Sequence, residues 1–284
     1  MVDKEKALIV GLGEVGRPLF ELLRESDKFS VYAFDVDEAK MREVGQNPNS
    51  LPSEVNTMHV CIPYKDAGFE DAVVNCVKRF RPKLVIINST VAPGTTMSLR
   101  KRCNCLVTHS PIRGVHVSLE HMKWELKRYT KYVGGANAEA GEAARRHFEK
   151  MSLKTKVLRS CTESELAKLF ETTYRAWMIA CFQEMHRISR SFDADFDQIT
   201  DFIEDTHRMR WDRPIMFPGV IGGHCVIPNT DLLLKSYDSE FLHLIEESNE
   251  KRKKEMEDKR IKDEVEKVKK RVEAFDKEIE EGKR

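Results

Sequence analysis

The chain of 284 residues carries 48 Lys and Arg against 47 Asp and Glu, a formal net charge of +1. This balance gives no electrostatic basis for binding nucleic acid. No apolar segment approaches the ~20 residues that are needed to span a bilayer. We therefore expect neither nucleic acid nor a membrane as a partner.

Seven cysteines are scattered through a chain that is large enough to form its own core, which favours reduced thiols. The first residues run directly into an apolar, strand-like segment rather than a secretory signal. These two features predict a cytoplasmic protein. Cys103 and Cys105 form a C-x-C pair, but no second ligand pair lies at zinc spacing, so we predict no metal site.

Short apolar segments alternate with helical patterns through the first half of the chain. The strand-like segments are residues 6–10, 30–37, 58–63, 83–90, 105–111 and 154–160. Because parallel strands are joined by crossover helices, this alternation predicts an α/β fold with a mostly parallel, Rossmann-like sheet covered on both faces. We assign this domain to residues 1–160.

The first strand-like segment ends in a glycine motif, GLGEVG, which a helical pattern follows. Gly11 permits a tight turn, Gly13 lets the backbone approach a pyrophosphate, and Gly16 allows close packing of helix on strand. Asp35 comes about 20 residues later, where its carboxylate could accept both ribose hydroxyls and so favour NAD over NADP. The turn residues Glu14 and Val15 complete the predicted NAD-binding set.

The second half of the chain reads as helical. Residues 161–191 place apolar side chains at three- and four-residue spacings, which predicts one long helix capped by Thr162 or Ser164. A shorter helix is expected over 195–205. Residues 217–229, FPGVIGGHCVIPN, hold two prolines and three glycines and are expected to be neither helix nor strand. We assign residues 161–237 to an all-helical domain.

Lys168 and Cys225 are the candidate chemical groups in this half. Lys168 has apolar neighbours, and a partly desolvated lysine beside a cofactor can donate protons or stabilise an oxyanion. A solvated surface lysine is the alternative. Cys225 adjoins His224 in a segment that exposes backbone N–H groups, a setting typical of a reactive thiol. A small buried cysteine with a structural histidine is the alternative.

The order of several motifs resembles the nucleotide-sugar dehydrogenases. The motifs are GLGEVG, VCIP, STVAPGTT, HSP, ELAKLFETTY and GVIGGHCVIP, and they span about residues 5–235. Those enzymes are the NAD-dependent UDP-glucose, GDP-mannose and UDP-N-acetylmannosamine 6-dehydrogenases, and GGHC-x-x-P is most similar to the last branch. The resemblance implies that an alcohol is oxidised to an aldehyde, which the cysteine captures as a thiohemiacetal. A second oxidation then gives a thioester, which water hydrolyses to the acid.

By position, the resemblance implies that Cys225 is the nucleophile and that Lys168 stabilises the oxyanion. It implies that Thr90 positions water or substrate, and that Thr90 and Pro63 contact the cofactor. The family also has a second Rossmann-like domain that binds the nucleotide, whereas only residues 230–284 follow the cysteine segment. Either the substrate is smaller, or a dimer partner or another subunit recognises the nucleotide.

Five positions depart from the family pattern. They are Ile112 and His116 in place of glutamates, Thr172 and Gln183 in place of asparagines, and Asn229 in place of an aspartate; Glu184 keeps the acid after Gln183. We keep Thr172 and Asn229 in the predicted catalytic set. His116 could act as a general base because the pKa of a free histidine is near neutral. A histidine in a surface loop is the alternative.

Residues 238–284 are predicted to form a charged C-terminal helix. Its acids and bases recur at i,i+4 in the favourable orientation. Its apolar positions, spaced 4-3-4-3-4, are Ile261, Val265, Val268, Val272, Phe275 and Ile279. This seam could pair with a second copy or lie on its own chain.

Three functions remain open. The first is an NAD-dependent oxidoreductase that takes a primary alcohol of a sugar or sugar nucleotide towards the acid through a Cys225 thiohemiacetal. The second is a single-step dehydrogenase similar to the 3-hydroxyacid dehydrogenases, with Lys168 as the proton shuttle. The third is an NAD-binding regulatory or assembly protein whose chemistry is degraded. We expect a homodimer formed through the central helix, with the C-terminal helix as a second candidate contact.

Overall fold

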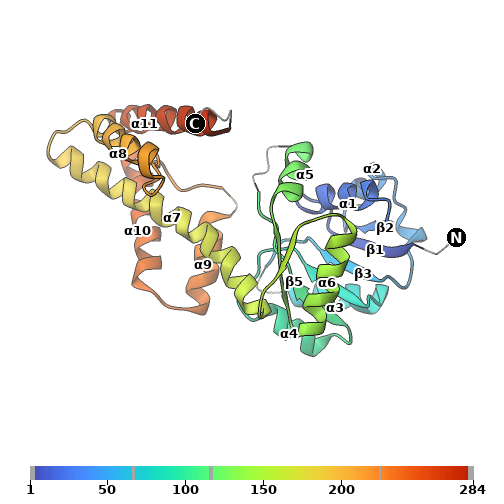
Figure 1. The fold of residues 1–284 in the computed structure, drawn as a ribbon. Coiled ribbons are helices and arrows are strands. Elements are labelled where there is room, and N and C mark those ends of the chain that lie inside the picture. The colour runs from blue at the N-terminus through green and yellow to red at the C-terminus, as the bar shows by residue number, and fades with distance from the viewer. Residues whose placement is uncertain (1–3, 66–67, 115–117, 224, 281–284) are drawn as a thin grey trace. The chain divides into compact units, whose positions relative to one another are not determined.

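The computed structural model describes residues 4–65, 68–114, 118–223 and 225–280. They form two compact units, Met1–Lys168 and Leu169–Arg284 (Figure 1). The strands of the first unit are β1 (Glu5–Val10), β2 (Phe29–Phe34), β3 (Thr57–Val60), β4 (Leu84–Ile87), β5 (Leu106–His109), β6 (Lys131–Gly135) and β7 (Thr155–Val157). Its helices are α1 (Gly16–Glu25), α2 (Glu38–Glu43), α3 (Phe69–Phe80), α4 (Thr95–Arg102), α5 (Leu119–Arg128), α6 (Ala138–Lys150) and the start of α7 (Cys161–Ser191).

The strands form one sheet in the order β2-β1-β3-β4-β5-β6-β7. Every pairing is parallel except that of β5 with β6. The prediction of a Rossmann-like, mostly parallel sheet is therefore confirmed. The chain leaves β1 towards β2 on one side and returns to β3 on the other, which places a topological switch point at the carboxyl end of β1.

Strand β6 was not predicted. Its sequence, KYVGG, ends in two glycines and so lacks the apolar pattern of the other strands. Close approach explains both glycines: a Cβ at Gly134 would lie 2.4 Å from the Ser164 Oγ, and one at Gly135 would lie 2.3 Å from the Gly141 amide nitrogen. Packing constraints that come from distant residues leave no signal in a local pattern.

Helices cover both faces of the sheet (Figure 1), and alternate residues of the central strands belong to the two different cores. In β1, Ala7 and Ile9 belong to the core beneath α1, α5 and α6. Leu8 and Val10 belong to the core beneath α3 and α4. Because both faces are buried, these strands read as continuous apolar segments rather than as alternating ones.

A chain of buried polar side chains crosses the sheet. The His59 Nδ1 lies 2.9 Å from the Asn88 Oδ1, so His59 donates there and its Nε2 accepts from the His147 Nε2 at 2.8 Å. The His147 Nδ1 then faces the Thr57 hydroxyl at 3.3 Å, and the Asn88 amide donates to the Ser110 carbonyl at 2.8 Å. Burial lowers the pKa of His59 to about 4 and that of His147 well below its usual range, so both rings are neutral.

The second unit consists of the rest of α7 and four further helices. These are α8 (Phe196–Arg210), α9 (Val226–Ser236), α10 (Glu240–Glu255) and α11 (Lys259–Glu280). The predicted C-terminal helix over 238–284 is therefore two helices. Asp258 separates them: its side chain accepts the Arg260 amide at 2.7 Å and starts α11 anew.

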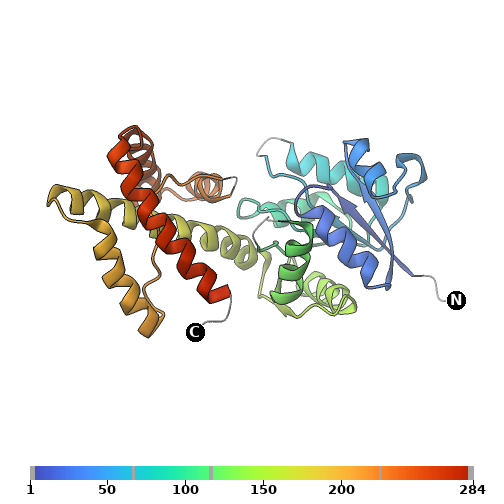
Figure 2. The same ribbon diagram turned by 90° about the horizontal axis from the view of Figure 1, so that it is seen from above.

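Helix α11 lies across α7 and alongside α8 (Figure 2). Five of its predicted seam residues are buried, and Ile279 is partly buried; Val268, Val272 and Phe275 pack with Phe182 of α7 and Phe196 of α8. The seam thus lies on its own chain.

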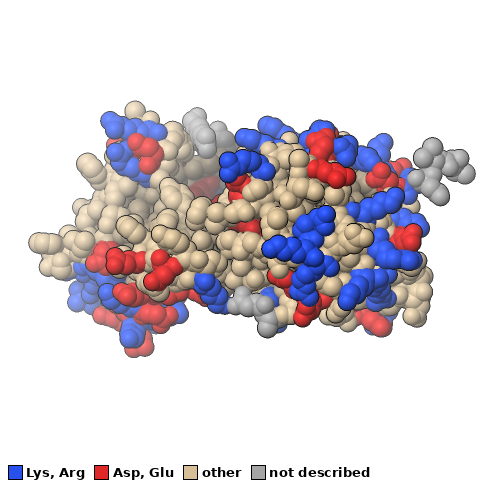
Figure 3. Space-filling view, turned by 90° about the horizontal axis from the view of Figure 1, so that it is seen from below, with Lys and Arg blue, Asp and Glu red and all other residues tan. Residues whose placement is uncertain are grey.

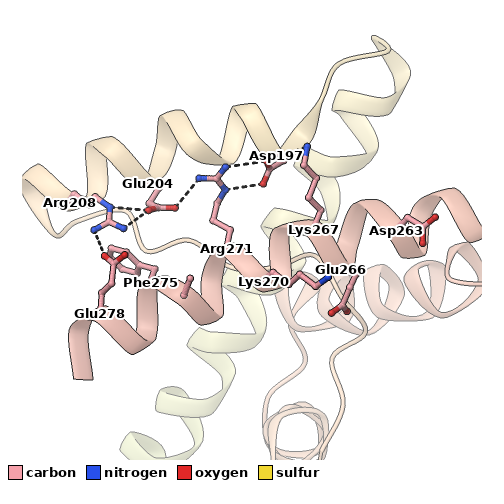
Figure 4. A pocket seen from close by; sticks show the side chains of 11 residues that line it. Asp197, Glu204, Arg208, Asp263, Glu266, Lys267, Lys270, Arg271, Phe275 and Glu278 are labelled. Atoms are coloured by element: carbon pink, nitrogen blue, oxygen red, sulfur yellow. Dashed lines mark hydrogen bonds and ion pairs between the residues drawn. The ribbon is translucent and has the colours of Figure 1, made fainter. Parts of the chain in front are cut away.

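Ion pairs between α8 and α11 flank this packing, beside a groove of about 620 Å³ (Figure 4). Arg271 bonds both carboxylate oxygens of Asp197, at 2.9 and 3.1 Å, and Arg208 bonds Glu278 at 2.7 Å. Since these bases are paired with acids, the groove is a contact between two helices of the chain rather than a basic site. Across the part of the chain that the structure describes, no helix is long and apolar enough to cross a membrane.

Candidate active site

The three glycines of the GLGEVG turn serve different purposes. Gly11 has φ +95°, and a Cβ there would lie 2.7 Å from the Cys61 carbonyl oxygen. At Gly16 a Cβ would lie 1.7 Å from the Gly11 carbonyl oxygen. Gly13 is exposed, and a Cβ there would meet no atom within 4 Å. The protein's own packing therefore requires Gly11 and Gly16, whereas Gly13 leaves open space in which a ligand could approach the backbone.

Asp35 lies beside this turn, just after β2. Its carboxylate accepts the Leu12 amide at 2.6 Å and the Asp37 amide at 2.9 Å. Helix α1 begins at Gly16, with Val15 at the N-cap position and no acidic residue in its first turn. A helix amino end with free N–H groups can hold a phosphate, and a nearby carboxylate can hold a ribose, so the turn fits a dinucleotide.

The loops that follow β3, β4 and β5 are hydrogen-bonded to one another. The Ser89 hydroxyl donates to the Ile62 carbonyl at 2.6 Å. The His109 Nε2 donates to the Ser89 carbonyl at 3.1 Å. Half-buried Thr90 and exposed Pro63 extend from these loops. The structure therefore brings together, at one edge of the sheet, the residues predicted to bind the cofactor.

The first turn of α7 docks on the same loops. The Ser164 Oγ lies 2.8 Å from the His109 Nδ1. Glu165 is fully buried and accepts the Gly94 amide at 2.7 Å and the Thr96 amide at 2.8 Å. Lys168, half-buried, lies one turn further along this helix.

The pKa shifts of His109 and Glu165 are consistent with the burial of both side chains between α7 and these loops. Burial, together with the charges of Lys131 and Lys168, lowers the pKa of His109 to about 3, against the hydrogen bond to the Ser89 carbonyl. Burial raises the pKa of Glu165, against the hydrogen bonds from Thr96 and Gly94.

Sequence reasoning missed the roles of His109, Ser164 and Glu165, although HSP and ELAK were recognised as motifs. The predicted cap was also wrong: the Ser160 hydroxyl, not Thr162 or Ser164, accepts the Thr162 amide at 3.2 Å, because the helix begins at Cys161.

Lys131 supports the HSP segment from below. Its buried ammonium group donates to the carbonyls of Ser110 and Pro111, both at 3.1 Å. Burial lowers its pKa to about 7. Ile112, where the family resemblance implies a glutamate, is buried in the core beneath α1. Position 112 therefore contributes an apolar side chain to the core and no acid to the site.

In the second unit, Cys225 is exposed and stands at the N-cap position of α9. The expectation that residues 217–229 lack helix was wrong at its end, because α9 begins at Val226. Pro228 is tolerated there since the first turn of a helix leaves its N–H groups unpaired in any case. The amino end of α9, where the helix dipole is positive, therefore lies next to the thiol.

The segment before Cys225 is held by two buried amides. The Gln183 side chain donates to the Gly219 carbonyl at 2.7 Å. Asn249 accepts the Ile221 amide at 2.7 Å and donates to the Ile221 carbonyl at 3.1 Å. These contacts fix the course of the backbone towards Cys225. Asn249 lies in the charged C-terminal region, where no pattern pointed to it.

The substituted positions Thr172 and Asn229 touch each other. The Asn229 amide donates to the Thr172 hydroxyl at 3.0 Å, and that hydroxyl donates to the Leu169 carbonyl at 2.9 Å. Both side chains are buried. The two departures thus form one neutral contact between α7 and α9.

Glu14 lies in the glycine turn and is exposed. Glu184 does not join these clusters: it is exposed and pairs with Arg187 at 2.9 Å. His116 and His224 lie outside the described residues. All seven cysteines are free thiols. Within the described ranges, no group of three or more His, Cys, Asp or Glu side chains could hold a metal ion.

A Rossmann-like sheet with a glycine turn, followed by a helical unit, is the architecture of known dehydrogenases. A UDP-D-ManNAc dehydrogenase from Pyrococcus horikoshii superposes with a TM-score of 0.71 at 20% identity, over 86% of this chain and 68% of that one. A 3-hydroxyisobutyrate dehydrogenase from Mycobacterium tuberculosis superposes with a TM-score of 0.64 at 14% identity, over 90% and 94% of the chains. At these identities the likeness establishes the fold.

Sequence comparison identifies the group of dehydrogenases that the chain resembles. Residues 162–251 match the central domain of the UDP-glucose/GDP-mannose dehydrogenase family. The UDP-N-acetyl-D-mannosamine dehydrogenase of Methanocaldococcus jannaschii is 24% identical over 286 aligned positions, 87% of this chain and 65% of that relative. The chain is therefore similar to the nucleotide-sugar dehydrogenases, and the resemblance inferred from its motifs is confirmed. It spans 65% of the length of that curated relative.

The Thr172–Asn229 contact predicts a coupled pair of substitutions. Asn229→Asp alone sets a buried carboxylate against a hydroxyl whose proton serves Leu169, and should lower the free energy of unfolding by about 1–3 kcal/mol. Thr172→Asn supplies an amide donor, so the double variant should recover at least ~1 kcal/mol of that loss. Urea unfolding of the wild type, both single variants and the double variant measures the coupling. Effects that add to within ~0.5 kcal/mol would contradict it.

Proposed function

We propose that the chain is an NAD-dependent oxidoreductase that oxidises the primary alcohol of a sugar nucleotide towards the acid. The observation that carries the proposal is the open backbone at Gly13, beside the Asp35 carboxylate and at the switch point of the sheet. The curated relatives, named as dehydrogenases of UDP-sugars, support the substrate class.

The dinucleotide would rest on the GLGEVG turn. The amino end of α1 would hold the pyrophosphate, and the second carboxylate oxygen of Asp35 would share its lone pairs with the ribose. Val36, whose side chain is 92% exposed directly after Asp35, offers an apolar surface to the base. When bound, NAD supplies the hydride acceptor. Pro63 and Thr90 extend from neighbouring loops and would border its reactive end.

The chain's own residues carry the covalent steps. The alcohol first loses its hydroxyl proton and a hydride and becomes an aldehyde. The Cys225 sulfur then adds to the aldehyde carbon, the C=O double bond opens, and the thiol proton passes to the oxygen, which becomes the hydroxyl of the thiohemiacetal. Loss of hydride from the thiohemiacetal leaves a thioester, and water cleaves it to the acid and the free thiol. Lys168 stabilises the negative charge on the substrate oxygen in these steps, and Thr90 holds the attacking water or the substrate. His116 is the proposed general base, since position 112 is apolar core.

Cofactor binding is tested at Gly13. Gly13→Ala should fold like the wild type, because no protein atom lies within 4 Å of the added Cβ. The methyl group would occupy the space next to the pyrophosphate, so the Kd for NAD should rise about tenfold or more, roughly 1.4 kcal/mol. Isothermal titration with NAD and thermal unfolding provide the two measurements.

Gly16→Ala is the contrasting variant, since its Cβ would collide with the Gly11 carbonyl and destabilise the unit itself. An unchanged Kd for NAD in folded Gly13→Ala would exclude the turn as the cofactor site.

The covalent mechanism is tested at Cys225. With a UDP-sugar whose C6 is an alcohol, the wild type should form two NADH per substrate. Cys225→Ser should stop after the first oxidation and release no acid, because a hydroxyl is a weaker nucleophile and leaving group than a thiolate. NADH absorbance and mass spectrometry of the product follow both oxidations. Cys181→Ser, which changes another exposed thiol, is the matched control.

If one NADH forms and the activity survives in Cys225→Ser, the single-step alternative that relies on Lys168 is correct. NAD binding without turnover on any tested alcohol points to the regulatory alternative.

We propose that the active form is a homodimer through the second unit. Exposed apolar side chains lie at helical spacing along α7, namely Phe170, Tyr174 and Ile188, and exposed Phe192 follows directly after the helix. Figure 3 shows a broad area of this unit occupied mostly by residues that are neither acidic nor basic. Exposed apolar side chains that gather on one helix are typical of an interface. Sedimentation should therefore give a dimer at micromolar concentration, and Tyr174→Asp with Ile188→Asp should give monomers that still fold. A monomeric wild type would count against the proposal.

A further inference from the structure

Glu165 occupies a position that the proposed chemistry does not yet use. Helix α4 begins after Gly94, which has φ +94° and no side chain with which to cap the helix. The Glu165 carboxylate, from α7, takes that place and accepts the amides of Gly94 and Thr96. A helix start without its own cap needs such partners because its first N–H groups are otherwise unsatisfied.

The other end of the same loop is also held by α7. Ser89, where the loop begins, gives its carbonyl to the His109 Nε2 at 3.1 Å. The His109 Nδ1 faces the Ser164 Oγ at 2.8 Å. Residues 89–96 are therefore held at one end directly by Glu165 and at the other end by His109, which links Ser89 to Ser164; Thr90 lies between these two contacts. Because Lys168 follows on that helix, these bonds set the position of Thr90 relative to Lys168.

We infer that Glu165 is a positioning residue for the reaction proposed above: it holds the Thr90 loop against the helix that carries Lys168. The inference rests on the proposed function. Glu165 itself is buried by the loop and acts through Thr90 and Lys168. Its chemistry must be that of a carboxylate, since each of its two oxygens accepts from a different backbone amide.

Glu165→Gln tests this with little change of volume. The glutamine has one acceptor oxygen, and its NH2 group would face a backbone N–H that now donates at 2.7 or 2.8 Å. The loop should loosen, so the amides of Gly94 and Thr96 should exchange with solvent at least tenfold faster, measured by hydrogen exchange and mass spectrometry.

The kinetic signature separates positioning from general damage. In Glu165→Gln the kcat should fall about tenfold or more, as Thr90 and Lys168 lose their fixed spacing. The KM for NAD should stay within about threefold, since the glycine turn and Asp35 are untouched. Glu163→Gln is the matched control: it lies in the same turn, is partly exposed, and bonds Arg159. It should leave exchange and kcat as in the wild type.

Ser164→Ala provides a second variant if Glu165→Gln does not fold. It removes the hydroxyl that faces His109 and should lower kcat in the same direction, with the KM for NAD unchanged. Faster exchange with an unaltered kcat, or a lower kcat with unaltered exchange, overturns the inference. A wild type without turnover is a different result: it rejects the proposed reaction, and the positioning role with it. The exchange experiment would still show whether the carboxylate holds the loop.

Discussion

The parallel direction of β1, β3, β4 and β5 is the constraint on which the candidate site depends. Parallel strands end at one edge of a sheet, so the loops that follow them must lie side by side. Hydrogen bonds from Ser89, His109 and Asn88 then join these loops, and Glu165 adds the long helix to them. Residues that are far apart in the chain meet there because the backbone leaves them little alternative, and the placement of Lys168 follows.

Features whose cause is local could be predicted from the sequence. The apolar strands, the long helix and the glycine turn each arise from neighbouring residues, and all appear where the patterns indicated. The separate reasons for the glycines could not be predicted: Gly16 is required by an oxygen of Gly11, whereas Gly13 meets no protein atom. Strand β6 and the start of α9 were missed for a similar reason. Position 134 must be glycine because the Ser164 side chain lies too close for a Cβ, and Pro228 is compatible with a helix because it lies in the first turn of α9.

Side-chain roles in the site depend on contacts across long stretches of sequence. Glu165 bonds amides some 70 residues away, and no spacing rule connects them. Thr172 and Asn229 read as two separate losses, yet in the structure each is the other's hydrogen-bonding partner. An amide and a hydroxyl satisfy each other where an unpaired buried charge would carry a large desolvation cost. The two substitutions therefore belong together: they replace a pair that includes a charged carboxylate with a neutral hydrogen-bonded pair.

The loss of acidic residues from the family pattern affects some steps of the proposed reaction more than others. Forming the thiohemiacetal and losing hydride need a nucleophile and a cation near the substrate oxygen, and in the proposed reaction Cys225 and Lys168 would supply both. Cleaving the thioester needs a base to activate water. Ile112 belongs to the core, and Asn229 cannot take up a proton as an aspartate could. The departures from the family pattern thus remove acids that could activate water, whereas the residues proposed for the two oxidations are retained. In the proposed reaction, the activation of water would therefore rest on His116, the proposed general base.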